Sequence, residues 1–140
     1  MYQFLISNRD ELIARCRAKV AGRSPPGTAG EELKHGITVF LDQVIKTLAL
    51  ERTSDPMRSR KVSGRSGGGK PALSEIGESA AQHGKELMQH GFTVEEVVHD
   101  YGDLCQAITD LAFEQDAAIS IDGFRTLNRC LDNAIANAVT

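Results

Sequence analysis

Apolar residues recur every three or four positions along most of the chain, which is the spacing of one face of an α-helix. Five segments have this period, and none has the strict alternation that marks a half-buried strand. The first segment ends before the prolines of "RSPPG" at 23–27, because proline cannot continue a helix. Its predicted core positions are Leu5, Leu12, Ile13, Cys16 and Val20.

Capping signals mark where the next two helices begin. Thr28 stands three residues before Glu31, so each side chain can bond the other's free backbone N–H in a capping box. Ser74, which follows the glycine-rich run, can cap the third helix. The predicted core positions of the second helix are Leu33, Ile37, Phe40, Leu41, Val44 and Leu48, and those of the third are Ile76, Ala80, Gly84 and Leu87.

The fourth and fifth helices have the longest stripes. A second capping box joins Thr93 to Glu96, and Phe92 can pack across it on Val97. The fourth stripe contains Val94, Val97, Val98, Tyr101, Leu104, Cys105, Ile108 and Leu111; the fifth contains Phe124, Leu127, Leu131, Ala134, Ile135 and Ala138. The fifth helix reaches Thr140 without a glycine cap or a proline, so we expect it to continue into a further domain.

These elements predict an all-α, up-and-down bundle of about five helices in a single domain over 1–140. A long disordered basic linker at 51–72 is predicted between the second and third helices. Within it, "GRSGGGKP" at 64–71 places Gly64, Gly69 and Lys70 at the spacing of a phosphate-binding loop. Pro71 replaces the required Ser or Thr and no strand precedes the loop, so a linker is the preferred interpretation.

Charge and composition exclude several functions. The net charge of −3 divides into +4 on residues 51–72 and −7 on the remainder, and an acidic body does not favour nucleic-acid binding. No run is long and apolar enough for a membrane helix, and no targeting segment precedes the first helix, so we expect a cytoplasmic domain. The three widely spaced cysteines, Cys16, Cys105 and Cys130, are typical of reduced core thiols.

The histidines are the candidate functional residues. His83 and His90 share one edge of the third helix's stripe, and Gly84 beside them lets a neighbouring helix approach closely. They stand about 10.5 Å apart along the axis, too far to bind one metal ion together. His99 and Asp103 are four residues apart on the side opposite the fourth stripe, where they form either a solvated acidic face or a pH-sensitive contact surface.

Catalytic patterns are incomplete. "HDYGD" at 99–103 begins like the phospho-acceptor box of a histidine kinase, but the downstream Asn or Thr is absent. No nucleophile and base have a spacing that brings them together, so we expect no enzyme activity, no cofactor and no metal. The alternative left open is a metal- or cofactor-binding bundle that uses His83, His90 or the His99–Asp103 pair.

A longer match lies in "SAAQHGKELMQHGFTVEEVVHDYGDLCQAITDLA" with "FRTLNRCLDNAIANAVT", and it extends to "FLISNRDELIARCRAKVAGRSPP" and "HGITVFLDQVIKTL". These segments resemble the N-terminal helical domain of bacterial sensor histidine kinases, which is similar to the N-terminal domain of RsbRD-type stressosome co-antagonists. The resemblance implies a non-catalytic signal-input domain that forms a homodimer and relays its state through the last helix to a kinase domain in the same chain.

The resemblance assigns no ligand. The candidate signal-binding residues are therefore the polar and aromatic groups inside the matching motif, and they stay hypotheses. They are His83, His90, His99, Asp100, Tyr101 and Asp103.

Overall fold

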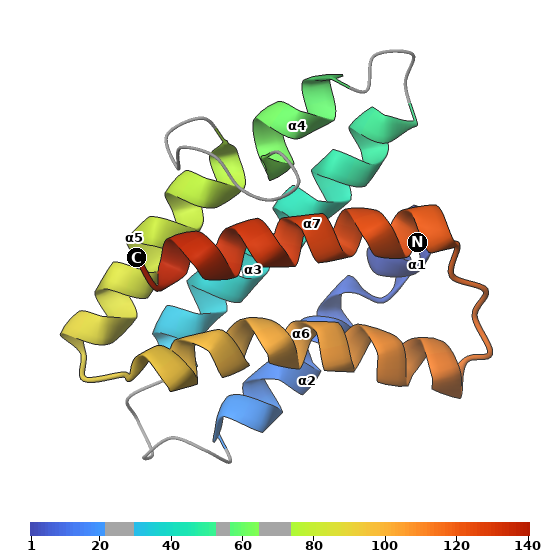
Figure 1. Cartoon of the computed structure of the whole chain (residues 1–140). Helices are drawn as coiled ribbons and strands as arrows, with labels where there is room; N and C mark the ends of the chain where they lie inside the picture. The colour runs from blue at the N-terminus through green and yellow to red at the C-terminus, as the bar shows by residue number, and fades with distance from the viewer. Residues whose placement is uncertain (22–29, 53–56, 65–73) are drawn as a thin grey trace.

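The computed structural model describes residues 1–21, 30–52, 57–64 and 74–140, with only the backbone described at 30–35 and 57–59. These residues form seven helices and no strand, which confirms the predicted all-α class (Figure 1). The helices are α1 (Tyr2–Ser7), α2 (Arg9–Ala21), α3 (Gly30–Glu51), α4 (Met57–Ser63), α5 (Glu75–Gln89), α6 (Val94–Glu114) and α7 (Ile121–Ala138).

The helix count exceeds the predicted five at two places. Asn8 divides the first predicted helix, because its backbone N–H closes α1 on Phe4 while its carbonyl accepts the first bond of α2 from Leu12. The second addition, α4, lies inside the predicted linker. The rest of that linker, 53–56 and 65–73, and the predicted cap at Thr28 lie outside the described residues.

Helix α4 is held to α7 mainly by polar contacts. Val62 is its one described buried apolar side chain. The Ser63 hydroxyl accepts a hydrogen bond from Arg129 Nε at 3.0 Å, and the Ser63 carbonyl accepts one from Asn133 Nδ2 at 2.8 Å. A helix stabilised in this way has no apolar stripe of its own, so hydrophobic periodicity did not indicate it.

Helices α6 and α7 run side by side in opposite directions, and α3 passes behind them (Figure 1). The N-terminus of the chain lies near the start of α7, and the C-terminus lies at α5. Fully buried leucine and isoleucine side chains from six of the helices fill the space between them: Leu5, Leu12, Leu41, Ile76, Leu87, Leu104, Ile108 and Leu127. Most predicted core positions are therefore confirmed, whereas Val94 and Phe124 are exposed. The side chain of Leu33 lies outside the described residues.

Local caps fix where α5 and α6 begin. The Ser74 hydroxyl accepts a bond from the Gly77 N–H at 3.0 Å, as predicted. The capping box of α6 is also confirmed, because Thr93 Oγ1 accepts from the Glu96 N–H at 3.2 Å while Glu96 Oε1 accepts from the Thr93 N–H. These bonds satisfy donors that the first helical turn cannot pair internally.

The close approach predicted at Gly84 is confirmed, and the partner is the end of α7. A Cβ atom at Gly84 would stand 1.9 Å from the backbone carbonyl oxygen of Ala138. Only a residue without a side chain leaves room for that backbone, so the last turn of α7 rests directly on α5.

Candidate functional site

The six predicted site residues divide into three environments. His83 and Tyr101 meet in the core, between α3, α5 and α6. His90 and His99 lie at the surface. Asp100 and Asp103 are buried on another side of α6. The six residues therefore do not form one site, and the first pair lines a pocket.

His83 is 6% exposed and lies against Gly36 of α3. A Cβ atom at Gly36 would stand 2.1 to 2.3 Å from three atoms of the imidazole, so the glycine makes room for the ring. The Tyr101 ring meets it edge to face, with centroids 6.0 Å apart. Burial lowers the pKa of His83 below its usual range, because the interior disfavours the charged form, and the imidazole is neutral at pH 7.

Unlike the buried His83, His90 lies at the surface. It is the C-cap of α5, its ring is exposed, and Nδ1 lies 2.7 Å from the carbonyl oxygen of Glu86. The chain leaves the helix at this point, and Gly91 follows with φ of +91°.

Of the two alternatives for the face that carries His99 and Asp103, the solvated face is wrong at Asp103, where the structure shows a contact with another helix. His99 is exposed and its Nε2 lies 3.6 Å from Glu95 Oε1, whereas Asp103 is 7% exposed and Asp100 is 2% exposed. Helix α2 packs on this side of α6, which a single-helix pattern could not reveal. Burial first, and then the negative charge of Asp103, raise the pKa of Cys16 on α2 to about 12.

The cavity beside His83 has a volume of about 210 Å³. Phe40, Ile76 and Tyr101 form the apolar part of its wall. Gln43, Ser79 and His83 contribute polar groups to it. Gln43 Nε2 donates to Ser79 Oγ at 2.9 Å. Gln43 Oε1 and His83 Nε2 are buried and have no hydrogen-bond partner among the described residues.

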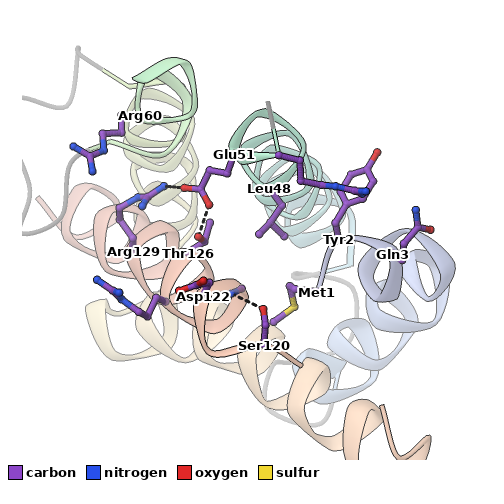
Figure 2. A pocket seen from close by; sticks show the side chains of 13 residues that line it. Met1, Tyr2, Gln3, Leu48, Glu51, Arg60, Ser120, Asp122, Thr126 and Arg129 are labelled. Atoms are coloured by element: carbon purple, nitrogen blue, oxygen red, sulfur yellow. Dashed lines mark hydrogen bonds and ion pairs between the residues drawn. The ribbon is translucent and has the colours of Figure 1, made fainter. Parts of the chain in front are cut away.

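A larger cavity of about 650 Å³ lies between α1, α3, α4 and α7 (Figure 2). Glu51, at the end of α3, accepts a bond from the Thr126 hydroxyl at 2.6 Å and pairs with Arg129. Three more guanidinium groups line the cavity, from Arg52, Arg60 and Arg125. The sequence analysis missed this cluster because its members come from separate segments, and it ties α7 to the end of α3.

The structure also bears on the predicted metal site, the cysteines and the phosphate loop. No group of three His, Cys, Asp or Glu side chains able to hold a metal occurs among the described residues, so the metal-binding alternative gains no support there. The cysteines are free thiols; Cys16 and Cys130 are buried and Cys105 is half-buried. Gly64 ends α4 rather than following a strand, and residues 65–71 of the proposed phosphate loop lie outside the described part of the chain.

Comparison with known proteins assigns a family. Residues 7–140 match the family described as the RsbT co-antagonist protein rsbRD N-terminal domain. No curated protein and no solved structure matches the chain. Within the described residues, no helix combines the length and the apolar character needed to cross a bilayer. The RsbRD-type part of the resemblance noted in the sequence is confirmed over nearly the whole chain.

Proposed function

Because the chain belongs to the RsbRD N-terminal domain family, whose members are signalling domains, we propose that it is the input domain of a cytoplasmic sensor histidine kinase. The domain itself is non-catalytic. It forms a homodimer and passes its state along α7 to a kinase domain in the same protein. The kinase context rests on the motifs quoted above, since the family description names a co-antagonist protein.

The packing of α7 carries the proposal. Its inner face is buried through Leu127, Cys130 and Ala134, so a change in the core acts on it directly. Its first half is tied to α3 and α4 by polar contacts of Thr126 and Arg129. A continuous helix transmits a small rotation or shift, whereas a flexible linker absorbs it.

The last turn of α7 is coupled to a different element. There the backbone of Ala138 touches α5 at Gly84, without intervening side-chain atoms that could adjust. A movement of α5 relative to α3 therefore displaces the end of α7. This geometry suits an output helix, because its two ends are attached to different helices of the core.

Two exposed apolar side chains, Phe113 and Ile121, support the dimer. Phe113 is 89% exposed and Ile121 is 80% exposed, and these residues flank the connection between α6 and α7. A second copy would remove both side chains from water, which favours association. Sedimentation of the purified chain should give a dimer, and Phe113→Ser with Ile121→Ser should shift it toward the monomer; a wild-type monomer at all concentrations would contradict the dimer.

The relay is tested in the full-length kinase. Two glycines inserted directly after Thr140 should uncouple autophosphorylation from the input domain, because each interior glycine costs about 1 kcal/mol of helix stability. Two alanines inserted at the same point are the matched control for length, since they extend the helix without weakening it. A version without residues 1–140 gives the unregulated rate. Regulation that survives the glycine insertion unchanged would rule out the helical relay.

A further inference from the structure

The larger cavity, between α1, α3, α4 and α7, is open to solvent and carries an excess of positive charge (Figure 2). Among the described residues that line it, four are arginines and two are acidic, which leaves an excess of two positive charges. A hollow lined mainly by charges of one sign attracts ions of the opposite sign. The arginines are Arg52, Arg60, Arg125 and Arg129, and the acidic residues are Glu51 and Asp122.

Three of these arginines gather where α4 meets α7. Arg125 and Arg129 are four residues apart on α7, so their side chains leave the same face of that helix. Arg129 Nε donates to Ser63 Oγ of α4 at 3.0 Å. Arg60 precedes Ser63 by three residues and therefore stands on the same side of α4. Figure 2 shows Arg60 and Arg129 on this side of the cavity.

The charges of these three arginines are unequally compensated. Arg129 pairs with Glu51, and its side chain is only 13% exposed. Arg60 and Arg125 are exposed, and neither makes a hydrogen bond or an ion pair with another residue that the structure describes. The pair with Glu51 thus fixes α7 against the end of α3, while the two other arginines are available to a ligand.

The number of available arginines defines the charge of the ligand. Two uncompensated guanidinium groups match a dianion, whereas a monocarboxylate would leave one of them without a counter-ion. A phosphate monoester carries a charge of about −1.5 to −2 at pH 7 and places it on a single group with three acceptor oxygens. Arginine binds such oxygens with pairs of parallel N–H···O bonds. Because both side chains are long and exposed, they can turn onto the same phosphate.

The rest of the cavity suits the uncharged part of a small ester. Tyr2 lies across the cavity from Arg60 and Arg129 (Figure 2), and the buried Leu48 also lines it. The volume of about 650 Å³ falls within the range of small-molecule pockets, roughly 300–1,000 Å³. A long polyanion is disfavoured, because the residues outside 51–72 together carry −7.

We propose that the larger cavity binds a small phosphate monoester, with the phosphate held by Arg60 of α4 and Arg125 of α7 and the ester group toward Tyr2 and Leu48. Such a ligand ties α4 to α7, because each helix supplies one of the two arginines. Binding to the chain does not depend on the kinase. That the bound ester is the signal of the input domain rests on the function proposed above.

The binding test compares two esters of the same shape. At pH 8 phenyl phosphate carries two negative charges and phenyl sulfate carries one, so calorimetry of the 140-residue chain should detect phenyl phosphate binding at least tenfold tighter. Inorganic phosphate should bind more weakly than phenyl phosphate, because it has no group to contact Tyr2 and Leu48. Failure of phenyl phosphate to bind, equal affinities for the two esters, or equally tight binding of inorganic phosphate would each overturn the proposal.

Variants locate the binding. Arg60→Gln and Arg125→Gln should each weaken phenyl phosphate binding about tenfold, because each removes one of the two available charges. Arg17→Gln, at an exposed position on α2 outside the cavity, changes the net charge equally and should leave binding unchanged. Circular dichroism should show the same helical fold in all three variants. Equal weakening in all three would reveal a general effect of net charge, and unchanged binding in both cavity variants would place the ester elsewhere; both results contradict the site.

The two proposals can fail separately. If phenyl phosphate does not bind but the glycine insertion still uncouples the kinase, the cavity proposal is wrong and the relay stands. If phenyl phosphate binds through Arg60 and Arg125 but leaves autophosphorylation unchanged in a kinase that the insertion uncouples, the site stands and its role as the input is overturned.

Discussion

Gly84 and Ala138 are in direct backbone contact, with the carbonyl oxygen of Ala138 occupying the space that a side chain at position 84 would need. The contact joins the middle of α5 to the last turn of α7. A single methyl group added at position 84 would therefore push apart two helices that are in contact in the native fold.

Gly84→Ala should lower the free energy of unfolding by about 1–3 kcal/mol, because the new Cβ would stand 1.9 Å from the Ala138 oxygen and α7 must shift. Denaturant unfolding followed by circular dichroism measures the change. Gly102→Ala on α6 is the matched control, since no atom lies within 4 Å of a Cβ added there. That variant should raise stability by up to about 1 kcal/mol. Equal effects at both positions would contradict the close contact.

Stability should depend on pH through His83. Its folded pKa lies below the unfolded value of about 6.5, so below that value the unfolded chain binds a proton that the folded chain does not. The contribution of His83 is therefore complete above pH 6.5 and is lost as the pH falls toward the folded pKa. The loss is at most about 1.4 kcal/mol per pH unit for one group.

Urea unfolding of wild type and His83→Gln at pH 7.5, 6.5 and 5.5 measures this dependence. The variant should have the flatter profile over that range. Gln106→Ala is the control for the substitution itself, because Gln106 is exposed on α6 and carries no titratable group, so this variant should keep the wild-type profile. A slope that survives in His83→Gln would assign the titration to another group.

The three thiols should react with iodoacetamide in a fixed order at pH 8. Cys105 is half-buried and reacts first. Burial raises the pKa of Cys16 and of Cys130 from 9.0 to about 12, so their thiolate fractions are roughly a thousandfold smaller than that of an ordinary thiol. Mass spectrometry should find one modified cysteine in the folded chain and three after unfolding. Cys105→Ser should abolish the first modification, and rapid labelling of Cys130 in that variant would contradict the described burial.

Helix α6 could be predicted from its own sequence because its capping box and most of its apolar stripe are local features. Helix α4 could not, since the groups that bind Ser63 come from Arg129 and Asn133, 66 and 70 residues later. The prediction of a solvated face at Asp103 failed in the same way. Asp103 is buried because α2 covers it, and no periodicity within α6 contains that information.

The candidate site was predicted in part. The motif drew attention to His83 and Tyr101, which do lie together. It gave no signal for Gln43, because an isolated glutamine on α3 is unremarkable until the neighbouring helix leaves its amide oxygen without a partner. It also grouped His83 with His90 and His99, whose rings lie at the surface.

The N-terminal helices bind to residues that are synthesised much later. Arg15 on α2 pairs with Glu114, 99 positions along the chain, and Asn8 bonds Gln115, 107 positions along. A ribosome adds residues at about 5–20 per second, so roughly 5–20 s separate the appearance of Arg15 from that of Glu114. During that interval the apolar stripe of α2 has α3 to pack against but not α6. The nascent chain therefore leaves this stripe partly uncovered until the residues of α6 have been synthesised.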